Sequence, residues 1–272
     1  RDIIKITIIY QATIDKIFYD FIDFTKVECI IEDITNINAL DKRLGEYDYI
    51  INAAGYGQPN KFLEDQLKTI ELNTSSTILL FSKLKKGGKF LFVSSSEVYS
   101  GINTHQTEDI VGTTTPDHPR SCYIEGKKCG ETICNIHRKL GVNAKSVRLS
   151  LTYGPGTKRD DKRMLSNFIQ KGLINKEIKL LDHGKSTRTF LYVADAVIMF
   201  WNILFNGKEN TYNVGSTESK SIFNAAKMVG KIMNVPVIKP EDEHSLIGSP
   251  KSVKISMNRY KNEFGDLKMT SF

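Results

Sequence analysis

Short runs of apolar, largely β-branched residues recur through the first 150 positions, and they constrain the fold more than any other feature of the chain. Because the runs lack the polar alternation of a half-solvated strand, each predicts a strand buried on both faces. Segments of helical periodicity separate them, at about residues 60–84 and 121–140. Strands joined in this way predict a parallel sheet covered on both sides, a doubly wound α/β fold. The strand candidates are IKITIIY (4–10), VECII (27–31), YDYIINAAG (47–55), KFLFVSS (89–95) and AKSVRLS (144–150).

The pattern changes after residue 150, where the apolar runs become shorter and the loops longer. We expect residues 1–150 to form a Rossmann-type nucleotide-binding domain. Residues 151–272 should form a smaller mixed lobe, intertwined with the first, that binds substrate over the carboxyl ends of the strands. The signals in this lobe are a loop at YGPGTKRDDKR, a helix over 163–175, a short strand in EIKLL, a helix over 193–205 and a serine-capped helix start in NVGSTESKS.

Charge and composition argue against several classes of partner. No apolar run approaches the ~20 residues that a membrane helix needs, and the first residues do not read as a signal peptide. The net charge of +7 comes from dispersed lysines rather than from a basic stripe with interleaved aromatics, which argues against nucleic acid. The cysteines and histidines show no metal-ligand spacing, and the cysteines show no disulfide framework. We therefore expect a cytoplasmic protein with free thiols and with no metal, membrane or nucleic-acid partner.

One expected motif is absent. A nucleotide-binding sheet of this type should carry a Gly-rich turn between its first strand and first helix, where it cradles a pyrophosphate. In this chain AAGYG follows a later strand and YGPG lies in a loop. We expect that the sequence begins after that turn, so that the first strand and the turn are missing from it. The alternative is a protein that binds no dinucleotide.

Three segments carry residues suited to chemistry. The strand in FVSSSEVYS delivers residues 94–97, Ser-Ser-Ser-Glu, at its carboxyl end, where ligands bind in such a sheet. CYIEGKK places Tyr123 and Lys127 four residues apart, on one face of a helix. An ammonium beside a phenol should lower its pKa from about 10 toward neutrality, which suits a general base. Ser95 would share a hydrogen bond with that phenol, and KSTRTF brings Arg188 to the mouth of the second lobe.

Each signal has a plain structural interpretation when it is taken alone. A Tyr-x-x-x-Lys pair is common by chance, and a serine run after a strand is usually a turn. Glu97 could cap that turn at the surface, and Arg188 could pair with Asp182 or Asp195. The order of the motifs and their positions on the expected elements together favour the catalytic interpretation.

In that order, the motifs resemble those of the extended short-chain dehydrogenase/reductases that act on nucleotide sugars, the NAD-dependent epimerases and dehydratases. The resemblance extends along nearly the whole chain. EDITN would place its acid and apolar residue at the adenine end of NAD, NAAG would line the cofactor, and ELNTSST would place an asparagine beside it. The cofactor contacts that the resemblance implies are Asp33, Ile34, Asn52, Ala53, Ala54, Gly55, Asn73, Ser94, Tyr123 and Lys127.

Within this family, SSEVY and PRSCYIEGKKCGET are most similar to the UDP-glucuronate decarboxylases. The resemblance implies transient oxidation of the sugar at C4, with NAD as hydride acceptor, Tyr123 as base and Lys127 on the nicotinamide ribose. The resulting β-keto acid loses CO2, and the hydride returns to C4. The remaining roles that it implies are Ser95, Glu97 and Arg188 in catalysis, and Ser96, Arg163 and Arg188 in binding the nucleotide sugar.

Several alternatives stay open. Glu97 disfavours a plain 4-epimerase, yet an NDP-hexose 4,6-dehydratase or a 4-epimerase remains the second candidate function. The third candidate is an NAD(P)-binding regulatory protein without turnover. Leu151 stands where the decarboxylases carry an asparagine, and Ser100 where a glycine is usual.

NADP remains an alternative to NAD, because the strand ending IIYQ carries no acid that would bind a ribose hydroxyl. The resemblance also implies a homodimer formed through two helices per subunit, the second over 121–140, and both ends of the sequence look short by about one strand-turn-helix unit.

Overall fold

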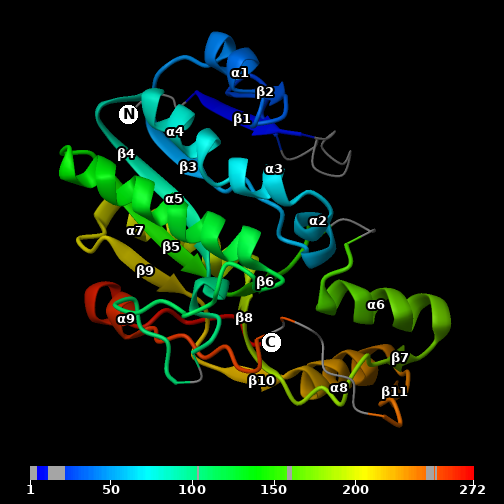
Figure 1. The fold of residues 1–272 in the computed structure, drawn as a ribbon. Helices are drawn as coiled ribbons and strands as arrows, with labels where there is room; N and C mark the ends of the chain where they lie inside the picture. Colours follow the sequence, from blue (N-terminus) through cyan, green and yellow to red (C-terminus); the bar gives the residue numbers. More distant parts are fainter. Residues whose placement is uncertain (1–4, 12–21, 103, 158–160, 243–247, 249) are drawn as a thin grey trace.

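A four-stranded parallel sheet lies at the centre of the molecule (Figure 1). The computed structural model describes residues 5–11, 22–102, 104–157, 161–242, 248 and 250–272. All three strand pairs of the sheet are parallel, as the unbroken apolar runs predict. The strands follow the order β3 (Tyr47–Asn52), β4 (Leu84–Ser95), β5 (Asn143–Leu149) and β9 (Thr211–Val214).

A separate two-stranded parallel sheet lies beyond the β3 edge. It pairs β1 (Ile6–Tyr10) with β2 (Val27–Ile31), in the register that places Ile6 opposite Val27. The helix α1 (Ile37–Arg43) follows it and leads into β3. Both expected strands at 4–10 and 27–31 therefore form, although residue 4 lies outside the described residues.

Helices cover both faces of the main sheet (Figure 1). On one face, α5 (Ser121–Lys139) packs against β4 and β5, and on the other α7 (Val193–Asn206) contacts the same two strands. The helical periodicity expected at about residues 60–84 corresponds to more than one helix. Three short helices occupy that stretch, because Asp65 caps the second of them through the Lys68 amide, and the polar run Asn73–Thr74 separates the last two. Their bounds are α2 Pro59–Glu64, α3 Gln66–Glu71 and α4 Ser75–Ser82.

The later part of the chain forms a smaller mixed region beside the sheet (Figure 1). The expected helices at 163–175 and 193–205 form, and Ser221 caps α8 by accepting a hydrogen bond from the Asn224 amide. The division at residue 150 remains a prediction, and β9 from beyond it adds a strand to the main sheet. The elements here are β6 (Leu151–Tyr153), α6 (Met164–Asn175), β7 (Ile178–Lys179), β8 (Thr187–Tyr192), β10 (Ser219–Ser221), α8 (Ile222–Met233), β11 (Val237–Ile238) and α9 (Asn258–Phe264).

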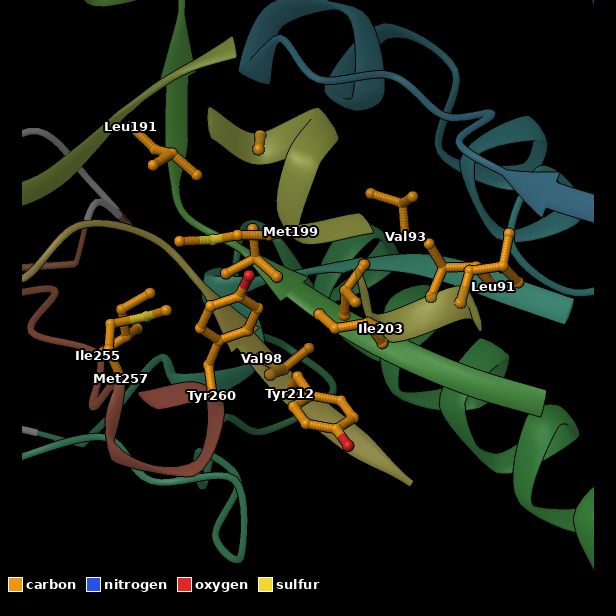
Figure 2. Packing of buried hydrophobic residues seen from close by; sticks show 14 of the residues in the cluster. Leu91, Val93, Val98, Leu191, Met199, Ile203, Tyr212, Ile255, Met257 and Tyr260 are labelled. Atoms are coloured by element: carbon orange, nitrogen blue, oxygen red, sulfur yellow. The ribbon is translucent and has the colours of Figure 1, made fainter. Parts of the chain in front are cut away.

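The largest core cluster ties the sheet to this later region. Figure 2 shows Leu91 and Val93 of β4 packed with Met199 and Ile203 of α7. Tyr260 of α9 belongs to the same cluster and is 1% exposed. Because one apolar core joins segments from before and after residue 150, the carboxyl end of β4 is held in a fixed relation to the later region.

At Gly130, helix α5 packs directly against the sheet. A Cβ at this position would overlap the ring of Phe92 on β4, which is completely buried. We expect Gly130→Ala to lower the free energy of unfolding by about 1–3 kcal/mol, the usual cost of overpacking a core. Urea unfolding of the variant measures this cost. Gly45→Ala is the matched control, since a Cβ there meets nothing within 4 Å, and equal losses in the two variants would contradict the packing argument.

Candidate active site

A cavity of about 980 Å³ opens at the carboxyl ends of β4 and β5. Its walls come from the sheet, from the start of α5 and from the later region around α6 and β8. The structure therefore brings most of the predicted site residues together around one space. Those that line it are Ala53, Gly55, Ser94, Ser95, Ser96, Glu97, Tyr123, Lys127, Arg163 and Arg188.

The end of β4 turns sharply into the cavity. A 3-10 turn over Ser96–Tyr99 follows the strand, and the Ser95 hydroxyl caps it by accepting a hydrogen bond from the Glu97 amide at 3.1 Å. Ser94 behaves differently, because its hydroxyl donates to Glu131 on α5 at 2.6 Å. The predicted cofactor contact Ser94 thus has its hydroxyl engaged by the protein itself.

Tyr123 lies in the first turn of α5, with its ring stacked on Phe62 at 4.8 Å between centroids. Its hydroxyl forms a hydrogen bond with Ser95. Burial raises the pKa of Tyr123 to about 12, and the neighbouring Glu97 carboxylate adds to this rise. The prediction that Lys127 lowers this pKa toward neutrality is therefore wrong. The Lys127 Nζ lies 5.9 Å from the tyrosine ring centroid and donates instead to the Val93 carbonyl at 2.8 Å.

Lys127 is only 4% exposed. Removal of its ammonium group from water disfavours the charged form, so burial lowers the pKa of Lys127 to about 8. The charge of Glu131 opposes this fall. Lys127 is thus an amine whose charge changes close to neutral pH, as is typical of functional lysines.

Glu97 faces a partner that sequence reasoning missed. Its Oε1 accepts a hydrogen bond from Arg120 Nη1 at 2.5 Å, while its Oε2 is buried and has no hydrogen-bond partner. The guanidinium of Arg120 also lies 5.9 Å from the Phe62 ring centroid. The sequence does place Arg120 three residues before Tyr123, close enough for both to lie at the start of the same helix. A carboxylate, a phenol and a guanidinium therefore meet at one end of the cavity.

Two further arginines complete the wall from the later region. Arg163 forms an ion pair with Asp161 at 2.7 Å, and Arg188 on β8 donates to the Thr187 carbonyl at 2.8 Å. Burial lowers the pKa of Arg188, and the Glu97 carboxylate opposes that fall. Among the described residues that line the cavity, eight are Lys or Arg and three are Asp or Glu. Such an excess of positive charge suits an anionic ligand.

The predicted contacts for the adenine end do not line this cavity themselves, although Gln11, which bonds to Asp33, does. Asp33 follows β2, accepts hydrogen bonds from Thr35 and Gln11, and forms an ion pair with Lys68. The side chain of Asn52 is internal, since it donates to Thr77 at 3.0 Å and accepts from the Ala54 amide at 3.1 Å. The five predicted residues outside the lining are Asp33, Ile34, Asn52, Ala54 and Asn73.

The family model described as the NAD dependent epimerase/dehydratase family matches residues 12–215. The chain belongs to this family. A UDP-glucuronic acid decarboxylase 1 of Xenopus tropicalis is 30% identical over 204 residues, which cover 74% of this chain and 48% of the relative. The chain thus spans about half the length of that curated relative.

Solved structures of epimerases and dehydratases share the fold. Pal from Bacillus thuringiensis superposes with a TM-score of 0.83 at 19% identity, covering 99% of this chain and 88% of that protein. A UDP-glucuronic acid 4-epimerase from Bacillus cereus was solved in complex with UDP-glucuronic acid and NAD. It superposes with a TM-score of 0.77 at 23% identity, covering 93% of this chain and 80% of that protein. The doubly wound α/β fold is thereby confirmed. Across the described residues, no helix has both the length and the apolar character to cross a membrane.

Membership of an NAD-dependent family implies a dinucleotide, and the residues beside Lys127 fit one end of it. Asn73 is completely buried, and its Oδ1 has no hydrogen-bond partner. Gly55 has a φ of +153°, and a Cβ there would lie 3.4 Å from Lys127 Nζ and 4.0 Å from Asn73 Oδ1. This glycine therefore keeps open a space lined by one orphaned acceptor and one ammonium donor. The sequence between β1 and β2 contains no glycine and therefore no Gly-rich turn that could bind a pyrophosphate. We assign no residue to pyrophosphate binding.

Proposed function

We propose that this chain is a nucleotide-sugar enzyme that oxidises C4 of its substrate transiently with bound NAD, and that its reaction is the decarboxylation of UDP-glucuronate. The product would be UDP-xylose or the corresponding 4-keto-pentose. The observation that carries the proposal is the meeting of the Ser95–Tyr123 hydroxyl pair with the Glu97–Arg120 ion pair in one cavity rich in positive charge. The sequence similarity to UDP-glucuronic acid decarboxylases supports the same reaction.

Tyr123 and Ser95 are placed for the oxidation step. NAD+, when bound, would supply the hydride acceptor, and Lys127 and Asn73 are the residues that would hold its nicotinamide end. Tyr123 Oη would take the proton of the C4 hydroxyl while Ser95 shares a hydrogen bond with both oxygens. Because burial raises the pKa of Tyr123 to about 12, deprotonation of its hydroxyl requires nearby positive charge.

Decarboxylation then follows from the chemistry of a 4-keto acid. The bond between C5 and the carboxylate breaks, CO2 leaves, and the electron pair passes into the C4 carbonyl as an enolate. C5 finally gains a proton from the site. Glu97 and Arg188 line the cavity near Tyr123 and are the groups that we assign to the carboxylate and to this proton transfer.

The direct test is incubation of the purified chain with NAD+ and UDP-glucuronate labelled with 13C in the carboxylate. We expect release of labelled CO2 and formation of a UDP-pentose, measured by mass spectrometry. Loss of water from an NDP-hexose without loss of CO2 would contradict decarboxylation and favour a 4,6-dehydratase. Inversion at C4 with the carboxylate retained would favour a 4-epimerase. Binding of NAD with no change in any nucleotide sugar would favour a regulatory protein.

A homodimer is a further part of the proposal. Helices α3 and α4 lie beside α5 and, together with the end of α5, expose apolar side chains that isolated surface helices rarely carry. A second copy packed on this surface would bury them. Light scattering of the purified chain tests this, with a monomer as the contrary result. The residues concerned are Leu67, Ile70, Ile78, Ile136 and Leu140.

A further inference from the structure

Helix α5 carries a third polar residue on the face that holds Tyr123 and Lys127. Glu131 follows Lys127 by four residues, so the three side chains lie in one row along the helix. The Glu131 side chain is 13% exposed, and the proposed reaction assigns it no role. A carboxylate held this far from water requires compensating contacts, and their identity indicates what the residue does.

The first contact is with the end of β4. Ser94 donates to Glu131 Oε1 at 2.6 Å, and the preceding residue, Val93, accepts from Lys127 Nζ at 2.8 Å. The next residue, Ser95, forms a hydrogen bond with Tyr123. Three consecutive residues of β4 are thus each bonded to a different member of the row on α5. This arrangement fixes the register between the strand end and the helix.

The second contact is a buried ion pair. Arg148 on β5 donates to Glu131 through Nη2 at 2.9 Å and through Nε at 3.0 Å, with its side chain 5% exposed. The Nη1 group of Arg148 is occupied elsewhere, by the Tyr99 hydroxyl at 2.9 Å and the Ile110 carbonyl at 2.8 Å. Because the guanidinium is anchored on two sides, the position of the Glu131 carboxylate is also fixed.

The surroundings of Lys127 contain little other charge. Its neighbours on α5 are the neutral Tyr123 phenol and the Glu131 carboxylate, and Glu131 is the charged group that most affects the Lys127 ammonium. Beyond Glu131 lies the cation of Arg148. The groups that face Lys127 from other elements are uncharged: the Val93 carbonyl, the Phe92 ring, and the nearby Asn73 and Gly55.

We propose that Glu131 is a positioning residue of the active site: anchored by Arg148, it sets the end of β4 through Ser94 and serves as the buried counter-charge of Lys127. The inference deepens the proposed function and rests on it, because it assumes that Lys127 takes part in the reaction. It adds that Glu131, held behind the cavity in a pair that does not line it, favours the charged form of Lys127 against the effect of burial.

Removal of the Glu131 charge should therefore change the titration of Lys127. Burial already lowers the pKa of Lys127 to about 8. Without its counter-charge, and with the Arg148 cation left uncompensated, the ammonium is further disfavoured. We expect the pKa of Lys127 in Glu131→Gln to fall by about one unit or more.

The test follows Lys127 by NMR in the full chain labelled with 13C at lysine Cε, with the signal assigned from its loss in Lys127→Met. Neither NAD nor substrate is needed. Glu125→Gln is the matched control, since it removes an ion pair with Lys128 from the same helix at 3.0 Å. Ser94→Ala removes the strand contact and keeps the charge. If Glu131→Gln does not fold, the Glu131→Met/Arg148→Met double variant replaces it, because apolar pairs replace buried ion pairs well. The pKa of Lys127 should still fall there, but by less than in Glu131→Gln, since the Arg148 cation is removed as well.

A downward shift in Glu131→Gln, with no shift in Glu125→Gln or Ser94→Ala, supports the counter-charge role. The alkaline limit of turnover should move down by the same amount. Coincident titration of Lys127 in wild type and Glu131→Gln overturns the inference. If the shift occurs but the chain decarboxylates no UDP-glucuronate, the proposed reaction fails while the role of Glu131 stands, so the two failures are distinct.

Discussion

Replacement of Tyr123 by phenylalanine is expected to lower turnover of the nucleotide sugar by about 100- to 10,000-fold, the range that a positioned general base contributes. The ring and its stacking on Phe62 at 4.8 Å are kept, so the fold should be unaffected. What is lost is the hydroxyl that pairs with Ser95 and takes the C4 proton. The measurement is the rate of UDP-pentose formation at saturating substrate, together with the affinity for NAD. We expect the affinity to change little, because Lys127 and Asn73 remain.

Tyr153→Phe is the control for this prediction. It removes a tyrosine hydroxyl that donates to the Ser271 carbonyl at 3.3 Å, away from the residues that line the cavity. Its turnover should match the wild type. Retention of more than about one tenth of wild-type turnover in Tyr123→Phe would remove the general-base role and, with it, the proposed C4 oxidation.

The largest effect on stability is expected from Arg148→Met. This variant leaves the Glu131 carboxylate buried without its cation, which typically costs about 3–5 kcal/mol of the free energy of unfolding. Although burial disfavours the charged guanidinium, its hydrogen bonds with Glu131 and the charge of that residue raise the pKa of Arg148 above its usual value. Arg148 is therefore charged in the folded protein, and its replacement removes the cation that the buried Glu131 carboxylate contacts. Urea unfolding near pH 7 measures the change.

Two controls separate this effect from a general loss of packing. Arg43→Met breaks an ion pair with Glu32 in which the arginine side chain is 46% exposed, and it should cost less than about 1 kcal/mol. The Glu131→Met/Arg148→Met double variant should recover most of the loss, because no isolated charge remains. A single variant as stable as the double variant would show that the Glu131 charge is not the cause.

Local patterns in the sequence predicted the secondary structure around the site well. The apolar runs gave β3, β4 and β5 and their parallel pairing, and the periodicity gave α5 over Ser121–Lys139. The exception was the stretch over 60–84. Apolar periodicity continues through it, but Asp65 and Asn73 bond to nearby backbone groups, and these local bonds divide the helix into three.

The placement of the site residues depended on tertiary contacts. The spacing of Tyr123 and Lys127 follows from the helix period alone, whereas their pKa values depend on burial, which a local pattern does not report. For this reason the predicted fall in the pKa of Tyr123 was wrong in direction. Arg120 was missed because its importance depends on Glu97, which lies 23 positions away.

What the sequence determined by itself was the α/β class, the row of polar residues on α5 and the serine-glutamate run at the end of a buried strand, because each depends on neighbours within a few residues. Only the tertiary structure decided which of these groups meet. Ser94 and Arg148 reach Glu131 from 37 and 17 positions away, on two different strands. The charge of a buried side chain is set by the sum of such contacts, and these exist only once the sheet and the helix have packed together.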